Sequence, residues 1–252
     1  MKKILIILLF AFLMYNCSGT KVSEKKVRVA VAANAFEVFK LVAKEFEKKT
    51  GIKCEIISGS SGKLTRQIIN GAPYHVFLAA NMKYPKTLFK KGLATALPKI
   101  YAKGALVLWS MLPSKLEKGL KTLESPSISK LAIANPEVAP YGVAAVQAFK
   151  ALKVYDNLKE KLVYAQNISK TNHYITTKTV DMGITAKSAV MSKRMKNKGK
   201  WIEIPVKYYS PVLQGMVITK YGEKNLYAEK LYKFVLSETS VELFKKAGYV
   251  FD

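Results

Sequence analysis

Two short polar turns carry the residue types best suited to hold an anion. Asn34 follows the apolar run 27–33, and Ser60-Ser61-Gly62 follows a second apolar run at 53–57. Helical spacing of apolar residues comes after each turn, so each turn is expected to open a helix, with Asn34 at the N-cap of the first. A helix N-terminus offers unpaired backbone N–H groups and a partial positive charge, to which Asn and Ser add side-chain donors. Two such helix starts facing one point would bind an anion without a lysine, and ordinary helix capping is the alternative.

The same residues fit catalytic chemistry poorly. A phosphate-binding P-loop needs four residues between its first Gly and the Gly-Lys pair, whereas 59–63 has two and is followed by Leu64. A nucleophilic serine needs a base nearby, but His75 and His173 are the only histidines and their spacing links them to neither serine. No Cys or His cluster has the spacing of a zinc site. We therefore expect no catalytic residue, no direct metal ligand and no enzyme.

The elements that would position the two turns alternate between strand and helix. Apolar runs predict strands at 27–33, 53–57, 76–80, 106–109, 130–134, 182–186 and 212–219. Helical spacing predicts helices at about 36–50, 63–69, 84–91, 143–152 and 156–162, with two more in 223–247. This alternation predicts an α/β fold with parallel strands covered on both faces. In an open parallel sheet, ligands bind beyond the carboxyl ends of the strands, where both turns would lie.

Length and composition bound the organisation of the chain. Its 252 residues, half of them hydrophobic, fit one large domain or two small lobes. No repeat and no Gly/Ser/Pro linker separates two independent domains, which favours two lobes that share crossing strands. Two cysteines cannot build a disulfide framework, and Cys54 lies in a strand-like run where a buried, unreactive thiol is expected.

The N-terminus has the pattern of an export signal. Two lysines precede the nonpolar run 4–15, which is shorter than the roughly 20 apolar residues of a membrane-spanning helix. We interpret 1–17 as a signal peptide and 18–26 as a tether, with an uncleaved anchor or a buried first helix as the alternatives. Cys17 resembles the lipid-modified cysteine of bacterial lipoproteins, although the residues just before it are not the small ones such signals prefer. The interpretation predicts an exported protein, with lipid anchoring left open.

The charge is strongly basic. Lys and Arg number 42 against 17 Asp and Glu, which gives a net charge of +25. The lysine-rich stretches 115–121 and 191–200 could contact nucleic-acid phosphates. However, lysines are spread over nearly every predicted helix instead of gathering on one face with aromatic residues. We therefore expect a solvated basic surface that steers small anions and no nucleic-acid partner.

An ordered set of segments points to a family. The segments are Val29-Ala30-Val31-Ala32-Ala33-Asn34, Gly59-Ser60-Ser61-Gly62-Lys63-Leu64, Gln67-Ile68, Asn70-Gly71-Ala72-Pro73, Val76-Phe77-Leu78-Ala79-Ala80 and Ala134-Asn135-Pro136. From about Val27 to the C-terminus, the chain resembles the periplasmic molybdate-binding proteins of ABC-type importers.

The resemblance implies a two-lobed periplasmic binding protein fold, with a parallel-type mixed sheet flanked by helices in each lobe. Lobe 1 would comprise 27–106 and 214–252, and lobe 2 would comprise 107–213. Two crossover segments, near Gly104–Leu108 and Pro211–Met216, would form the hinge. A monomer would hold molybdate or tungstate between the lobes without any cofactor and deliver it to an ABC permease in the membrane.

The resemblance also implies which residues bind the oxyanion. They are Asn34, Ser60, Ser61, Tyr141 and Ile168. Asn34 and Ser61 would donate through side chain and backbone, and Ile168 through its N–H alone. Tyr141 would donate through its N–H, with its hydroxyl as a further donor; packing between the lobes is the alternative role of its ring.

The chain departs from the family pattern at a few positions. Some members place a ligand Tyr where this chain has Ala186, so Tyr141 would replace it from a different loop. His75 and Asn81 stand where Asp is common, and we assign them no role.

The donor set limits the choice of anion. Molybdate and tungstate are fully ionised dianions that only accept hydrogen bonds, whereas monohydrogen phosphate carries a proton that needs an acceptor. None of the implied site residues is Asp or Glu, although Glu37, Glu137 and Asp181 lie not far along the chain. Sulfate is also a pure acceptor, so hydrogen bonding alone does not separate it from molybdate. The alternatives are therefore a binding protein for sulfate or phosphate, or an enzyme on the same two-lobed scaffold.

Overall fold

The computed structural model of the protein describes residues 25–251. The predicted signal peptide 1–17, its Cys17 and most of the tether 18–26 lie outside the described residues. Between residues 25 and 251, no helix is both long and apolar enough to cross a membrane.

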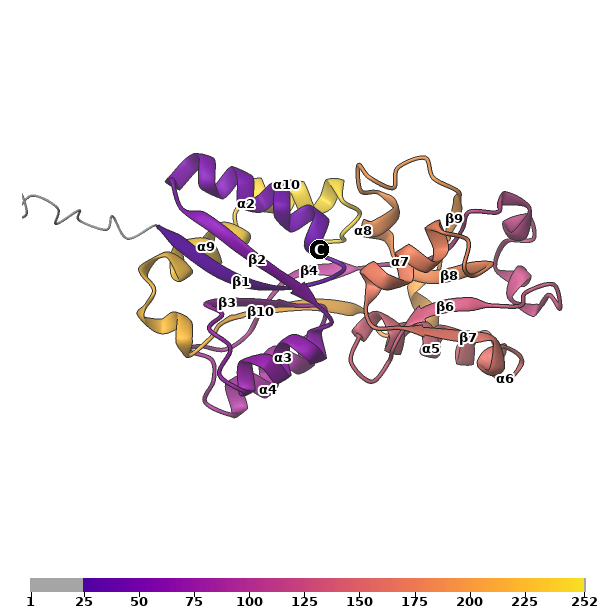
Figure 1. Cartoon of the computed structure of the whole chain (residues 1–252), viewed down its shortest axis with the longest axis horizontal. Coiled ribbons are helices and arrows are strands. Elements are labelled where there is room, and N and C mark those ends of the chain that lie inside the picture. The colour runs from indigo at the N-terminus through magenta and orange to yellow at the C-terminus, as the bar shows by residue number, and fades with distance from the viewer. Residues whose placement is uncertain (1–24, 252) are drawn as a thin grey trace, which may run out of the picture.

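The first of two five-stranded sheets builds lobe 1 (Figure 1). Its strand order is β2 (Lys53–Gly59), β1 (Lys26–Ala32), β3 (Val76–Ala79), β10 (Val212–Ile218) and β4 (Lys99–Gly104). Strand β1 runs parallel to β2 and β3, and β10 runs antiparallel to β3 and β4.

Helices cover both faces of this sheet. Alternate residues of β1 point to opposite faces, so Val29 and Val31 join one apolar cluster while Ala30 joins another. The first cluster is completed by α2 (Phe36–Thr50), α9 (Leu226–Val235) and α10 (Glu238–Lys246). The second is completed by α3 (Ser61–Ile69) and α4 (Lys83–Lys90). Figure 1 shows α2 and α10 on one side of the strands and α3 and α4 on the other.

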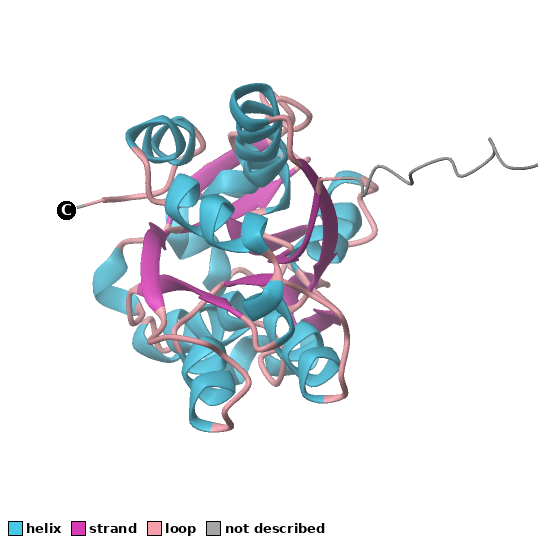
Figure 2. Ribbon diagram, turned by 90° about the vertical axis from the view of Figure 1, so that its left-hand side faces the viewer, coloured by secondary structure: helices cyan, strands magenta, loops and turns pink. Residues whose placement is uncertain are grey.

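The second sheet builds lobe 2. Its strand order is β7 (Leu162–Ala165), β6 (Leu131–Ala134), β8 (Met182–Ala186), β5 (Leu106–Ser110) and β9 (Lys200–Glu203). Strand β6 is parallel to β7 and β8, whereas β5 is antiparallel to β8 and β9. The mixed sheets flanked by helices confirm the predicted fold class, and Figure 2 shows the helices surrounding the strands.

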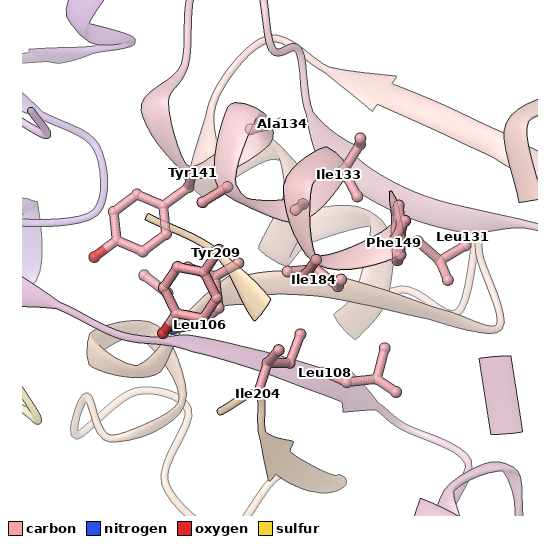
Figure 3. Close-up of a cluster of buried hydrophobic side chains, with 14 of the residues drawn as sticks. Leu106, Leu108, Leu131, Ile133, Ala134, Tyr141, Phe149, Ile184, Ile204 and Tyr209 are labelled. Carbon is pink, nitrogen blue, oxygen red and sulfur yellow. Dashed lines mark hydrogen bonds between the residues drawn. The ribbon is translucent and has the colours of Figure 1, made fainter. Parts of the chain in front are cut away.

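Two apolar clusters cover the faces of the second sheet. One joins Leu106, Leu108 and Ile133 to α5 (Pro140–Ala151) (Figure 3). On the other face, Trp109 and Ile175 pack together, which holds α7 (Ile168–Thr176) against the strands. The remaining helical segments are α6 (Tyr155–Leu158), α8 (Lys187–Val190) and the short 3-10 turns Pro113–Leu116, Gly119–Glu124, Lys159–Lys161, Val206–Tyr208 and Tyr221–Lys224.

Sequence patterns missed three strands and two helices, α7 and the short α8. Strands β4, β7 and β9 all lie at an edge of their sheet, where one flank is open and a continuous apolar run is not needed. Helix α7 is largely polar and buries only Ile168, Thr171 and Ile175, so its apolar spacing is weak. The helix predicted at 156–162 corresponds to α6, which continues as the 3-10 turn Lys159–Lys161 and ends where β7 begins at Leu162.

Two connections join the lobes. Ala105 links β4 directly to β5, and residues 204–211 link β9 to β10. The predicted lobe boundaries after residues 106 and 213 fall within the first residues of β5 and β10, and this division stays a prediction.

His75, which received no role from the sequence, supports lobe 1. Its Nδ1 accepts a hydrogen bond from the backbone N–H of Arg28 at 2.8 Å. Its ring stacks on Tyr221 with centroids 5.3 Å apart. Burial lowers the pKa of His75 from its usual 6.5, and the nearby charge of Arg28 acts in the same direction. The neutral imidazole therefore joins the start of β1 to the C-terminal part of the lobe.

The stability of the protein should fall as the pH drops below about 6.5. Since the pKa of His75 is lower in the folded chain, the unfolded chain binds more protons in the window between the two values, and folding becomes less favourable there. We expect urea unfolding of His75→Gln to lose this part of the pH dependence. His173→Gln, which removes the exposed histidine of α7, is the control. An unchanged pH dependence in His75→Gln would contradict the assignment.

Candidate functional site

A small pocket lies where the two lobes meet. Its walls come from the segments that follow β1, β2, β3, β6 and β7, so the carboxyl ends of five strands surround it. All five residues implied by the sequence line it. The full lining is Ala32, Ala33, Asn34, Gly59, Ser60, Ser61, Ala80, Ala139, Pro140, Tyr141, Asn167 and Ile168.

Three helices begin at this pocket, and each leaves its first free N–H group there. In α3, Val138 accepts from the N–H of Gly62 at 3.0 Å and the Oγ of Ser60 accepts from Lys63 at 3.4 Å. Neither contact uses the N–H of Ser61.

The other two helices show the same pattern. In α5, the N–H of Gly142 is bonded to Ala139 at 2.9 Å, and Pro140 has no N–H. In α7, the side chain of Asn167 accepts from the N–H of Lys170 at 3.0 Å. The N–H groups of Ser61, Tyr141 and Ile168 have no hydrogen-bond partner anywhere in residues 25–251. Unpaired N–H groups at helix starts are the arrangement that binds anions.

The hydroxyl of Ser61 is oriented by the backbone of lobe 1. Its Oγ accepts a hydrogen bond from the N–H of Ala80 at 2.9 Å. Because this bond occupies a lone pair, the hydroxyl hydrogen remains available to a guest in the pocket. Ser61 therefore offers two donors, its N–H and its O–H.

Asn34 is not the N-cap of α2, so that expectation was wrong. Ala35 holds the N-cap position and makes no side-chain cap. The amide nitrogen of Asn34 instead donates to Oε1 of Gln214 at 2.8 Å and to the hydroxyl of Tyr249 at 2.9 Å. Both amide hydrogens are thus used inside the protein, which leaves the backbone N–H, unpaired within the described chain, as the donor of Asn34.

Tyr141 uses its ring for packing. The ring lies at the edge of the lobe 2 cluster, with its hydroxyl pointing away from that cluster (Figure 3). The hydroxyl approaches Gly104 so closely that a Cβ there would collide with it. Burial raises the pKa of Tyr141 well above 10, so the phenol stays protonated. The backbone N–H is the donor that Tyr141 leaves for the pocket.

The pocket is uncharged and small. Its lining contains no Asp, Glu, Lys, Arg or His. Glu37 pairs with Lys40 at 2.6 Å, Asp181 accepts from the backbone of Ser129 and Lys130, and neither carboxylate lines the pocket. Its cavity volume is about 10 Å³, so little free space remains between the donors.

The remaining positions singled out in the sequence lie elsewhere. Glu137 bonds to Asn135, and Asn81 accepts from the N–H of Tyr84 at the start of α4. Ala186 ends β8 and is absent from the lining. The described chain also holds no cluster of three or more His, Cys, Asp or Glu that could bind a metal ion.

The profile of one protein family, described as "Bacterial extracellular solute-binding protein", matches residues 27–250. The chain belongs to this family. The match confirms the expected two-lobed fold and an extracytoplasmic solute-binding protein that is not an enzyme.

Named relatives of this solute-binding protein are described as binders of molybdate. The chain is 36% identical over 225 residues to "Molybdate-binding protein ModA" of Azotobacter vinelandii, with 89% of each chain covered. It is 34% identical over 226 residues to the protein of that name from Rhodobacter capsulatus, with 89% of this chain and 88% of the relative covered. The solved structure of the Azotobacter vinelandii periplasmic molybdate-binding protein superimposes with a TM-score of 0.86 at 34% identity, covering 90% of this chain and 99% of that one. These matches confirm the family resemblance found in the sequence.

Two hydrogen bonds hold the lobes of this solute-binding protein together beside the pocket. The N–H of Gly62 in lobe 1 donates to the carbonyl of Val138 in lobe 2 at 3.0 Å. The hydroxyl of Ser188 in lobe 2 donates to the carbonyl of Asn34 in lobe 1 at 2.9 Å. The described conformation is therefore closed around the pocket.

Gly62→Ala should hold the lobes further apart. A Cβ at this position would lie 3.0 Å from both Val138 Cα and the Tyr84 hydroxyl, closer than ordinary contact, so the closed arrangement of the lobes becomes less favourable relative to an open one. We expect small-angle scattering of the variant to show a larger radius of gyration than wild type. Gly59→Ala is the control, because its Cβ meets only the Leu64 side chain at 3.4 Å. Equal radii for wild type and Gly62→Ala would contradict this account of closure.

Proposed function

We propose that this solute-binding protein captures molybdate, and also tungstate, in the pocket between its lobes. The observation that carries the proposal is the convergence of unpaired N–H groups of Asn34, Ser61, Tyr141 and Ile168, with the Ser61 hydroxyl, on a pocket without charged residues. A fully ionised tetrahedral dianion accepts hydrogen bonds on every oxygen and has nothing to donate. A pocket of donors alone fits such a guest.

The relatives support this choice of substrate. Two of them, at 36% and 34% identity over nearly nine-tenths of the chain, are named molybdate-binding proteins. A closely superimposed structure carries the same description. Within this group, the neutral donor site of the present chain is best assigned to molybdate.

Phosphate fits the pocket less well than a fully ionised dianion. Monohydrogen phosphate needs an acceptor for its proton, and the lining offers no carboxylate. Sulfate satisfies the same donors as molybdate, so size decides between the two ions. Molybdate and tungstate are nearly equal in size and should both bind.

Delivery to an ABC permease in the membrane would follow from closure. A closed, loaded protein presents both lobes in one fixed arrangement, which a permease can distinguish from the open, empty form. We propose that the protein acts as a monomer in the periplasm after export directed by 1–17. Cys17 is the candidate point of lipid attachment, and no cofactor is required.

A thermal-shift panel tests the substrate. A ligand at 100 times its dissociation constant stabilises the folded state by about 2.7 kcal/mol, so molybdate and tungstate should each raise the melting temperature clearly. Measurement at low and high salt separates specific binding from general screening of the basic surface. A shift with sulfate or phosphate and none with molybdate or tungstate would reject the proposed substrate.

Ser61→Ala tests the donors. The variant loses the hydroxyl that would face the oxyanion, and a hydrogen bond to a charged group contributes about 1.5–3 kcal/mol. We expect calorimetry to show molybdate binding weakened by about that amount. The control is Ser192→Ala, because the Ser192 hydroxyl bonds to Ala189 on α8 and Ser192 does not line the pocket. Wild-type affinity in Ser61→Ala would place the anion elsewhere.

A further inference from the structure

Gln214 occupies an unusual position for a polar side chain. It is fully buried in β10, the strand that carries the second lobe connection into lobe 1. Its amide makes three hydrogen bonds. Oε1 accepts from the side chain of Asn34 at 2.8 Å, and Nε2 donates to the carbonyls of Ala80 at 3.2 Å and Val212 at 3.0 Å.

Two of these partners belong to segments that form the pocket. Asn34 lies in the turn between β1 and α2 and offers its backbone N–H to the pocket. Ala80 directly follows β3, and its own N–H orients the hydroxyl of Ser61 at 2.9 Å. One side chain thus connects the turn that holds Asn34 to the segment that orients Ser61.

The third partner lies at the connection between the lobes. Val212 is the first residue of β10. The pairing of β10 with β4 shifts register between Gln214 and Gly215, an irregularity of the kind that redirects a side chain. The carbonyl of Asn34 in turn accepts from Ser188 in lobe 2 at 2.9 Å. A continuous chain of hydrogen bonds therefore runs from the lobe connection through Gln214 and Asn34 to the opposite lobe.

We propose that Gln214 is a positioning residue for the bound oxyanion. This role rests on the proposed function. Gln214 fixes the distance and direction of the Asn34 and Ser61 donors, and it remains outside the pocket lining. Only a primary amide supplies one acceptor and two donors from the same planar group. A Glu would keep the acceptor and lose both donors, and a Met of similar length would lose all three contacts.

Gln214→Glu gives this role a readout that depends on pH. At about pH 8 a carboxylate would face the carbonyls of Ala80 and Val212 and displace the donor segments, so tungstate binding should weaken about tenfold or more. Burial raises the pKa of a carboxyl group, so lowering the pH to about 6 should protonate it and restore a donor. We expect the ratio of mutant to wild-type dissociation constants, measured by calorimetry, to fall about threefold or more across this range.

The two tyrosines beside the network stay protonated across that interval. Burial raises the pKa of Tyr249 from 10 to a still higher value and that of Tyr141 well above 10. Gln214→Met, which lacks a titratable group, should weaken binding to the same degree at both pH values. It also keeps the test decisive if Gln214→Glu does not fold.

Gln67→Glu is the matched control. Gln67, on α3, accepts a side-chain hydrogen bond from the hydroxyl of Tyr74 at 3.1 Å and does not line the pocket. The dissociation constant of Gln67→Glu for tungstate should stay within about twofold of the wild-type value.

The outcomes separate this inference from the proposed function. If wild type binds neither tungstate nor molybdate, the proposed function is wrong and the positioning role is wrong with it. If wild type binds while Gln214→Glu and Gln214→Met bind equally well, only the role of Gln214 is wrong. A loss in Gln214→Glu that does not change with pH would show that Gln214 supports the fold alone, and would also overturn the proposal.

Discussion

Donation of backbone N–H groups into an uncharged pocket is the interaction on which the site depends. An N–H group at a helix start carries part of the helix dipole and has no partner within its own helix. Here such groups from α3, α5 and α7 reach one pocket. This requirement explains the topology, because helices can begin together only where the strands before them end together. Strands β2, β6 and β7 satisfy this requirement because they all end at the boundary between the lobes.

A neutral site also ties binding to closure. Neutral donors hold a dianion strongly only when water is excluded, because water competes for the same hydrogen bonds. The Gly62–Val138 and Ser188–Asn34 contacts bring the lobes together beside the pocket and so limit that competition. Opening the lobes readmits water and weakens every contact at once. The net charge of +25 would attract anions from a distance, but no charged residue lines the pocket, so release of a bound anion would not require breaking a lysine ion pair.

The sequence predicts those parts of the fold that local patterns encode. Buried strands read as apolar runs, and α2 ends at Gly51, whose φ of 67° suits glycine. Edge strands such as β9 lack such runs, and α7 is too polar to show its period, so both were missed together with the helix start at Ile168. The sequence could not predict the partners of the Asn34 side chain for another reason. Gln214 and Tyr249 lie 180 and 215 residues away, and no local pattern carries that pairing.

At Asn34 the side chain and the backbone N–H have different partners. Its side chain is fully occupied by Gln214 and Tyr249, and its N–H alone is left for the guest. Ile168 behaves in the same way, since its side chain packs into the lobe 2 core while its N–H borders the pocket. Backbone donors are the same in every residue, so under the proposed function the anion would be recognised by how the turns are held. Gln214 and Tyr249, which fix the turn at Asn34 without lining the pocket, would then determine the geometry of recognition.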